Sequence, residues 1–180
     1  MNTPNKLTVF RMATVPVIVA VLCLGRPEIL WLRIAGVLFV IASLTDLLDG
    51  HLARKYHQIT NFGKLMDPLA DKLLVCSVLI CLTEWGHVPV WAVILIVARE
   101  FAISGIRLIA AEKGVILAAS RIAKIKTNAQ VFWVIWIMAS LPVSFREPVA
   151  LILMAASVIL TVVSLIDYVV KNKDLFKDLK

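Results

Sequence analysis

Long apolar stretches take up most of this sequence and constrain its fold more than any other feature. The chain has 180 residues and is 61% hydrophobic, and each apolar stretch approaches the ~20 residues that cross a bilayer as a helix. Charged residues make up only 17% of the chain, against about 25% in ordinary soluble domains. The sequence therefore predicts one all-α integral membrane domain over residues 1–180, a bundle of six transmembrane helices. The predicted spans are Leu7–Leu24, Ile29–Leu48, Leu69–Leu82, Val88–Ile109, Thr127–Leu141 and Pro148–Val170. The third is short for a span, and we expect Gly63–Ala70 to lengthen it on one side.

The basic residues predict which side of the bundle faces the cytoplasm. Of the 19 lysines and arginines, Arg26, Arg33 and Arg146 would lie on one side, Arg99 lies inside the fourth span, and the rest lie on the other side. Cytoplasmic loops carry an excess of Lys and Arg, so both termini are predicted to be cytoplasmic.

The net charge of +7 is first a membrane-surface effect. The tail from about 171 to 180 mixes lysines with apolar residues, which favours an interfacial helix on anionic lipid. Nucleic acid is not a predicted partner, because no basic patch is interleaved with stacking aromatics in a soluble module.

Four aspartates, Asp46, Asp49, Asp67 and Asp71, gather where the second and third predicted helices end and begin. On a helix, Asp46 and Asp49 share one face with Gly50 and Ala53, within an arc of roughly 100°. Asp67 and Asp71 are four residues apart and also point the same way if helical. Pro68 between them is tolerable in a first helical turn. Two acidic pairs on adjacent helices can converge on one site.

Carboxylates this close repel one another unless cations separate them. Hard divalent cations such as Mg²⁺ take oxygen ligands and keep phosphate oxygens in their shell. Two such ions would balance four aspartates, which is the arrangement of metal-assisted phosphoryl transfer. The alternative is that the aspartates are solvated helix caps or partners of Arg54, Lys64 and Lys72.

The whole stretch from Asp46 to Asp71 resembles the signature of the CDP-alcohol phosphotransferases. The matching residues are Asp46, Asp49, Gly50, Ala53, Arg54, Gly63, Asp67 and Asp71, with every gap between them matching too. PNKLTVFR near the start, AREFAISGIR at 98–107 and KIKT at 124–127 are similar to the bacterial members that use glycerol 3-phosphate.

This resemblance implies a multi-pass bacterial inner-membrane enzyme with its active site facing the cytoplasm. It implies transfer of a phosphatidyl group from CDP-diacylglycerol to sn-glycerol 3-phosphate, the first committed step toward phosphatidylglycerol and cardiolipin. Two divalent cations, Mg²⁺ or Mn²⁺, would be cofactors, and a homodimer among membrane lipids is expected. The implied metal ligands are Asp46, Asp49, Asp67 and Asp71.

The resemblance also implies roles for single residues. Asp71 is the implied general base, in addition to its role as a ligand. The CDP-lipid would contact Asp46, Asp49, Gly50, Ala53, Arg54, Gly63 and Asp67. Asn5, Thr8 and Arg11 either help to close the nucleotide side or anchor the first helix at the interface.

An acceptor that carries its own phosphate needs cations nearby. Arg99 lies deep in the fourth span, where an unpaired charge costs at least ~2.5–3.5 kcal/mol, and Arg107 lies two turns further along. We expect Arg99, Arg107, Lys124 and Lys126 to bind the acceptor phosphate, with Arg121 as an additional candidate. The alternative is an internal Arg99–Glu100 ion pair beside ordinary cytoplasmic basic residues.

Other functions stay open at this point. The same fold could use inositol phosphate, phosphatidylglycerol or serine as the acceptor. An intramembrane prenyltransferase also binds diphosphates through aspartates, and a cation transporter could line its path with them.

We expect no chemistry from His51, His57 and His87, and we expect Cys23, Cys76 and Cys81 to be small apolar fillers.

Overall fold

The computed structural model describes residues 3–25, 28–55, 61–112 and 120–172, with side chains left out at 3–5, 46–55, 61–65, 111, 112 and 121. The regular elements in these ranges are all helices, which confirms the predicted all-α class. They are α1 (Thr3–Leu24), α2 (Ile29–Lys55), α3 (Asn61–Glu84), α4 (Val90–Glu112), α5 (Arg121–Ala139) and α6 (Arg146–Lys171).

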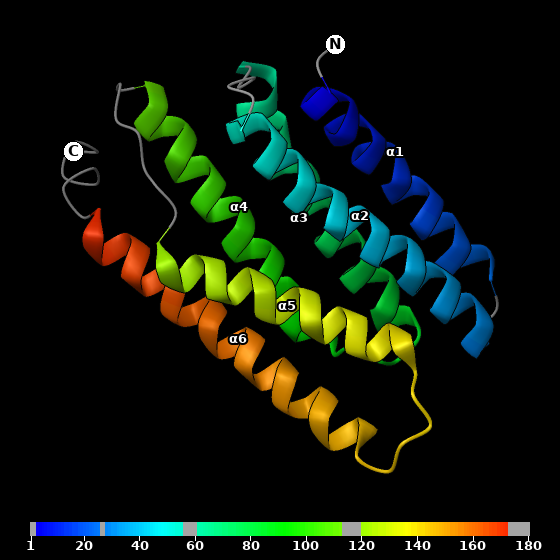
Figure 1. Ribbon diagram of the computed structural model, residues 1–180. Coiled ribbons are helices and arrows are strands. Elements are labelled where there is room, and N and C mark those ends of the chain that lie inside the picture. Colours follow the sequence, from blue (N-terminus) through cyan, green and yellow to red (C-terminus); the bar gives the residue numbers. More distant parts are fainter. Residues whose placement is uncertain (1–2, 26–27, 56–60, 113–119, 173–180) are drawn as a thin grey trace.

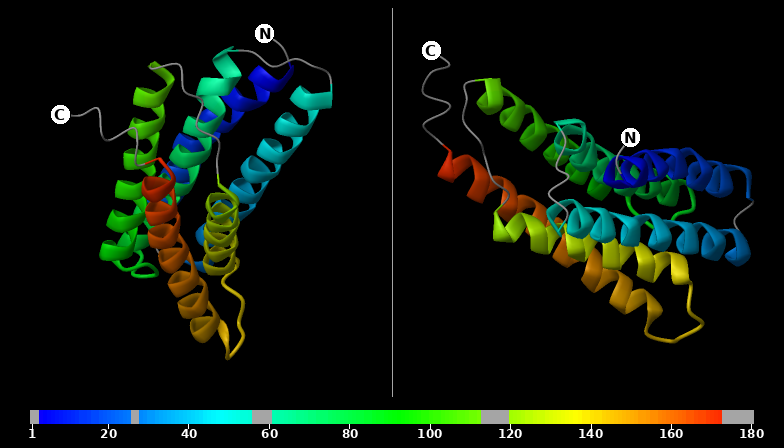
Figure 2. Two further views of the ribbon diagram at one scale, coloured as in Figure 1. Left: turned by 90° about the vertical axis from the view of Figure 1, so that its left-hand side faces the viewer. Right: turned by 45° about the horizontal axis from the view of Figure 1, so that its top comes forward.

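The six helices run back and forth, so that their ends gather at two ends of the bundle (Figure 1). The "motif end" holds the start of α1, the α2–α3 and α4–α5 junctions and the end of α6. The "far end" holds the α1–α2, α3–α4 and α5–α6 connections. Both ends of the described chain therefore lie at the motif end, toward the top of the left view in Figure 2.

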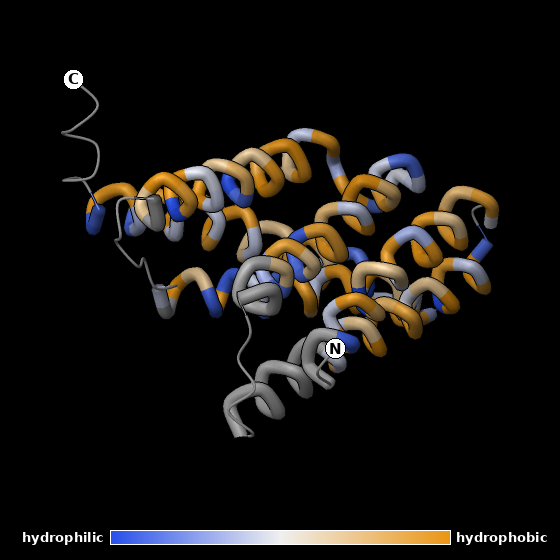
Figure 3. Tube along the Cα trace, turned by 90° about the horizontal axis from the view of Figure 1, so that it is seen from above, coloured by the Kyte–Doolittle hydropathy of each residue, from blue (hydrophilic) through white to orange (hydrophobic). Residues whose placement is uncertain are grey.

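The described surface is apolar while the interior contains charge. Phe101 is 70% exposed and Phe132 is 66% exposed, whereas Arg99, Glu100 and Lys126 are buried. Apolar residues follow the helices over most of their length (Figure 3). Charged side chains are stable in a bilayer when they face a bundle interior, so this arrangement is that of a membrane protein.

Two helices are long and apolar enough to cross a membrane by composition alone, over Lys6–Leu24 and Arg146–Lys171. The segment Ile29–Thr45 in α2 is apolar but shorter. The six-span prediction is therefore supported only in part. Helix α4 carries Arg99 and Glu100, and their charges lower its mean hydropathy even though both side chains are buried.

Helices α2 and α3 extend beyond the apolar stretches that predicted them. Helix α2 continues past Leu48 to Lys55, and α3 begins at Asn61 rather than at Leu69. The reason is that hydropathy marks the part of a helix that suits lipid, whereas backbone hydrogen bonding continues into polar sequence. Pro68 consequently lies inside α3 and not in its first turn, so the expected placement was wrong. It leaves one carbonyl of the preceding turn without its helical donor.

The buried core holds the helices together along most of the bundle. Helix α1 packs against α2 and α3, α5 packs against α6 and α2, and α4 packs against α3 and α6. Ile18, Phe39, Leu79 and Trp133 are among its most deeply buried members. This core fixes α3, α4 and α5 relative to one another, and these are the helices that carry most of the charged residues described below.

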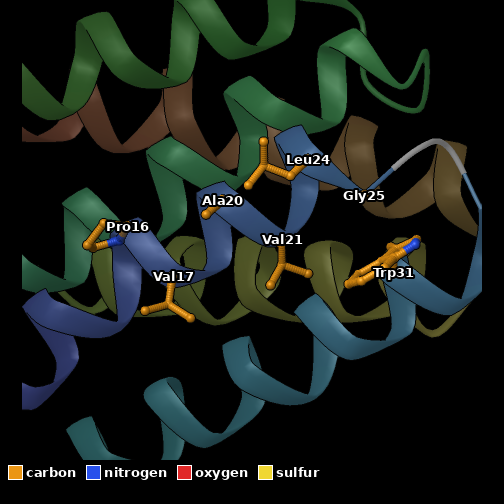
Figure 4. A pocket seen from close by; sticks show the side chains of 7 residues that line it. All are labelled: Pro16, Val17, Ala20, Val21, Leu24, Gly25 and Trp31. Atoms are coloured by element: carbon orange, nitrogen blue, oxygen red, sulfur yellow. The ribbon is translucent and has the colours of Figure 1, made fainter.

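Close contacts at the far end join the helices there. A Cβ added at Gly25 would lie 2.5 Å from Cγ of Trp31, so glycine is needed where α1 leads into α2. Beside this contact lies an apolar groove of about 490 Å³ lined by α1 residues and Trp31 (Figure 4). Arg33 in α2 donates to the carbonyls of Ala139 (3.2 Å) and Ser140 (3.0 Å) and thereby caps the last turn of α5.

Candidate active site

The acidic motif is carried by helical backbone on both sides of the α2–α3 junction. Asp46 and Asp49 lie in the last part of α2, so the premise that they share a helical face holds. Asp67 and Asp71 lie one turn apart in α3. The side chains of Asp46, Asp49, Gly50, Ala53, Arg54 and Gly63 lie outside the described residues, so their predicted contacts stay predictions.

Asp67 is connected to α1 through a buried hydroxyl. Thr8 Oγ1 donates to Asp67 Oδ1 at 2.5 Å, and Thr8 is 1% exposed. Arg11, three residues further along α1, is fully buried. Thr8 and Arg11 are therefore interior residues close to the acidic motif, which disfavours the interpretation of this pair as a surface anchor. The side chain of Asn5 lies outside the described residues.

A buried ion pair in α4 shares its carboxylate with a lysine of α5. Arg99 Nη1 donates to Glu100 Oε1 at 3.0 Å, and Lys126 Nζ donates to the same oxygen. The three residues are 7%, 7% and 2% exposed, respectively. The internal Arg99–Glu100 pair that the sequence left open is thus present. The pair does not occupy all donors of Arg99, because Arg99 Nε is buried and has no described hydrogen-bond partner.

Lys72 extends this network to α3, which the sequence did not predict. Lys72 Nζ donates to Ser104 Oγ, and Ser104 Oγ donates in turn to the carbonyl of Glu100 at 2.6 Å. Sequence reasoning treated Lys72 as one more basic residue of the cytoplasmic side. Its position directly after Asp71 was the signal that could have placed it at the site.

A small internal cavity brings the acidic motif and the buried cations together. Its volume is about 10 Å³, room for about one water molecule. Its lining residues come from α3, α4 and α5, and they are Asp71, Lys72, Val75, Cys76, Ile96, Glu100, Lys126, Thr127 and Gln130. The structure therefore places Asp71, the predicted general base, and Lys126, one of the predicted acceptor-phosphate residues, around one space.

Arg107 meets a residue of α6 that sequence reasoning missed. Its guanidinium carbon lies 5.8 Å from the ring centre of Tyr168, within the range of a cation–π contact. Tyr168 is 4% exposed, and neither its hydroxyl nor Arg107 Nε has a described hydrogen-bond partner. A buried polar group without a partner is costly, so these donors, like Arg99 Nε, suit an anionic ligand.

The remaining predicted cations are less closely tied to this cluster. Lys124 is exposed near the start of α5, and no described side-chain contact joins it to Glu100 or Arg107. The side chain of Arg121 lies outside the described residues. Arg99, Arg107 and Lys126 therefore lie in or beside the cluster, and binding of the acceptor phosphate stays a prediction for all five residues.

The described side chains alone do not form a metal centre. No group of three or more His, Cys, Asp or Glu among them could hold a metal ion, and the side chains of Asp46 and Asp49 are not part of this set. Asp67 and Asp71 are half-buried and offer only oxygen donors, which fits Mg²⁺ or Mn²⁺ better than softer metals.

Histidine contributes nothing to this cluster in the described structure, and cysteine contributes the cavity-lining Cys76. His87 lies at the far end, where burial foremost and then Arg146 lower its pKa, against a smaller opposite effect of Glu147. His51 and His57 lie outside the described side chains. All three cysteines are free thiols, as expected of structural residues.

Comparison with known proteins identifies the family. The chain belongs to the CDP-alcohol phosphatidyltransferase family, whose profile matches residues 1–163. This confirms the resemblance that the aspartate signature predicted.

Individual relatives carry more specific names. The chain is 42% identical over 190 residues to the CDP-diacylglycerol–glycerol-3-phosphate 3-phosphatidyltransferase of Bacillus subtilis (strain 168), covering 98% of this chain and 97% of the relative. It is 45% identical over 131 residues to the protein of the same name in Rickettsia bellii (strain RML369-C), covering 73% and 71%. It is 39% identical over 172 residues to a probable phosphatidylglycerophosphate synthase of Mycobacterium tuberculosis (strain ATCC 25618 / H37Rv), covering 94% and 81%.

Proposed function

We propose that this chain transfers the phosphatidyl group of CDP-diacylglycerol to sn-glycerol 3-phosphate and releases CMP. The observation that carries the choice of acceptor is the cation cluster beside Asp71, which consists of the buried Arg99 and Lys126 and the half-buried Arg107. A neutral alcohol such as serine would leave these cations without an anion, whereas an acceptor phosphate would use the free donors on Arg99 and Arg107. The names of the relatives support the same acceptor.

The acidic motif would hold the nucleotide side of the reaction. Asp46, Asp49, Asp67 and Asp71 would bind two divalent cations, Mg²⁺ or Mn²⁺, which when bound would neutralise charge on the diphosphate. The small residues Gly50, Ala53 and Gly63 would leave room for the cytidine, and Arg54 would add positive charge. Thr8 holds Asp67 from α1 and so restricts its orientation.

The acceptor hydroxyl would attack the phosphorus attached to diacylglycerol, and CMP would leave. Asp71 lines the cavity next to Lys126, so an acceptor whose phosphate contacts Lys126 would have its hydroxyls within reach of Asp71. Asp71 would accept the hydroxyl proton. Direct in-line transfer requires no serine or cysteine nucleophile, and the described cavity lining offers only the half-buried thiol of Cys76.

The same proposal includes the membrane arrangement. The six helices would all span a bacterial inner membrane, with the motif end in the cytoplasm and the lipid tails of CDP-diacylglycerol left in the inner leaflet. The placement of both described chain ends at the motif end supports an even number of spans. A homodimer is part of the proposal through family resemblance alone.

CMP release by the purified protein tests this function. With CDP-diacylglycerol and Mg²⁺, release is expected only when glycerol 3-phosphate is added, and EDTA is expected to abolish it. Release that requires inositol phosphate, phosphatidylglycerol or serine instead would retain the family and reject the acceptor. No release with any of these acceptors would favour ion binding by the aspartates, which flux measurements in proteoliposomes would detect.

The motif itself is tested by Asp49→Asn. We expect activity to fall at least about 100-fold, since loss of a residue behind the metal ligands already costs 10–100-fold. The variant should still insert into the membrane. Glu84→Gln at the far end is the matched control and should retain activity, because Glu84 is exposed at the end of α3. Turnover by Asp49→Asn close to that of the wild type would contradict the proposed role.

A further inference from the structure

Glu100 is a buried carboxylate at a place that is proposed to bind an anion. It lies between the cations Arg99 and Lys126 and accepts a hydrogen bond from each through the same oxygen, Oε1. A negative charge there would repel the phosphate of an acceptor. Its presence is therefore unexplained by phosphate binding alone and points to another role in the site.

We infer that Glu100 is a positioning residue, which holds Lys126 of α5 beside Arg99 of α4 so that the two cations form a preformed phosphate site. This inference rests on the proposed function, and it concerns how the acceptor site is built. Consecutive residues on a helix do not face each other, so Arg99 must fold back to reach Glu100. The carboxylate thus fixes the directions of two side chains that come from different helices.

Lys126 needs such a holder because a second carboxylate is close by. Asp71 lines the same small cavity as Lys126 and Glu100, and it attracts Lys126 electrostatically. A buried ammonium without Glu100 would turn toward Asp71. That ion pair would remove a cation from the phosphate site and a carboxylate from the proposed chemistry at once. Glu100 therefore keeps Lys126 in the phosphate site and leaves the carboxylate of Asp71 available for the proposed chemistry.

The position of Glu100 is itself secured from α3. Ser104 Oγ donates to the carbonyl of Glu100 and accepts a hydrogen bond from Lys72. Three helices, α3, α4 and α5, thus meet at the helical turn that carries the carboxylate. These contacts secure the backbone from which the Glu100 side chain extends toward Arg99 and Lys126.

The local charge still favours an anion in the presence of Glu100. The cations Arg99, Arg107 and Lys126 all act on Lys72 electrostatically, and the carboxylates of this cluster are Glu100 and Asp71. Positive charges outnumber negative ones, so Glu100 orders the cations without cancelling their attraction for a phosphate. When Glu100 is neutralised, loss of positioning would raise the KM for glycerol 3-phosphate, whereas loss of repulsion would leave it unchanged or lower it. The direction of the change in KM therefore tests the inference.

The test compares Glu100→Gln with the wild type and with the control Glu84→Gln. If Glu100 positions the cations, the KM for glycerol 3-phosphate should rise about tenfold or more, as for loss of a charge-assisted contact. The KM for CDP-diacylglycerol should change less than about twofold. A KM for glycerol 3-phosphate that is unchanged or lower in Glu100→Gln would overturn the inference, because neutralisation would then only have removed repulsion.

A double-mutant cycle with Lys126→Met asks whether Glu100 acts through Lys126. Adding Glu100→Gln to Lys126→Met should raise the KM for glycerol 3-phosphate by a smaller factor than Glu100→Gln does in the wild type, since one of the two side chains that Glu100 positions is already gone. Independent effects that multiply would reject the positioning role. A purely structural defect would instead lower the amount of folded protein and affect the KM of both substrates.

Inorganic phosphate provides a readout that does not depend on turnover. It should raise the thermal unfolding temperature of the wild type and of Glu84→Gln, and raise that of Glu100→Gln much less.

If Glu100→Gln fails to fold, Glu100→Asp keeps the charge with a shorter reach and should show an intermediate KM for glycerol 3-phosphate. A normal KM would count against the inference. Wild-type protein without glycerol 3-phosphate-dependent CMP release would reject the proposed function, whereas an active wild type with an unaltered Glu100→Gln rejects only this inference.

Discussion

Individual side chains connect the two halves of the candidate site through contacts that are short in space and long in sequence. Thr8 reaches Asp67 across 59 positions, and Lys126 reaches Glu100 across 26. The first contact joins a hydroxyl to a carboxylate and the second joins two charged groups, in an interior that is otherwise apolar. Such contacts are stronger than those at a surface and costly to leave unmade.

Thr8 provides a prediction for the nucleotide side. Thr8→Val keeps the shape and removes the hydroxyl, so Asp67 loses a donor that helps to orient it. We expect kcat/KM for CDP-diacylglycerol to fall about 3- to 10-fold, as for a hydrogen bond to a charged group, and half-maximal rate to need more Mg²⁺. Thr8→Ser retains the donor and should stay within about twofold of the wild type. A Thr8→Val protein with normal Mg²⁺ dependence would argue against this role.

Tyr168 provides a prediction for the acceptor side. Tyr168→Leu removes the ring that faces Arg107, and the KM for glycerol 3-phosphate should rise about 3- to 10-fold. Tyr168→Phe keeps the ring, so its KM should stay within about twofold. Its stability should not fall, because the buried hydroxyl has no described partner to lose. Equal KM values for Tyr168→Leu and the wild type would exclude a contribution of the ring.

At the scale of elements, helix ends carry much of the structural detail. The bundle has charged and aromatic side chains bound to backbone carbonyls at the far end. Arg33 caps α5, Trp85 Nε1 donates to the carbonyl of Leu22 at 3.1 Å, and Trp136 Nε1 donates to that of Arg146 at 3.0 Å. The carbonyls of Leu22 and Ala139 lie in the last turns of α1 and α5, where helix ends leave carbonyls without intrahelical partners, whereas that of Arg146 lies at the start of α6.

The Arg33 cap should contribute to stability and not to activity. Arg33→Met removes both hydrogen bonds to the end of α5, and we expect a loss of about 1–2 kcal/mol in the free energy of unfolding. Arg33→Lys keeps the positive charge near the helix end and should recover part of that loss. Thermal unfolding in detergent measures both. A large change in the KM for glycerol 3-phosphate in Arg33→Met would contradict the separation of the far end from the site.

The sequence predicted the elements well and their ends less well. Long apolar stretches located six helices, and the aspartate signature located the acidic motif, because both are patterns of neighbouring residues. The extension of the third helix back to Gly63 was expected because its apolar stretch is short for a span, and α3 begins close to that point, at Asn61. Tyr168, by contrast, was missed. Nothing in the sequence around a tyrosine in α6 shows that it packs against Arg107 of α4.

For the whole molecule, charge distribution links fold to function. Charged residues of three helices line one cavity, namely Asp71 and Lys72 of α3, Glu100 of α4 and Lys126 of α5, while the described exterior is mostly apolar. No single helix contains the cluster, so packing in the membrane assembles it. This explains why the internal Arg99–Glu100 pair and phosphate binding are compatible: the ion pair lowers the cost of burial, and the remaining donors stay available.

The orientation of the bundle gives a last prediction, which concerns the whole chain. In a variant without the native cysteines, His87→Cys places one exposed thiol at the far end and Lys171→Cys places one at the motif end. A membrane-impermeant maleimide should label His87→Cys in intact cells, and Lys171→Cys only after permeabilisation, because the motif end carries most of the basic residues. Labelling of both from outside would require an even number of spans between them, whereas the proposal has three, α4, α5 and α6. The reverse pattern would put the acidic motif outside the cell and reject a cytoplasm-facing site, while leaving the helical bundle itself unchanged.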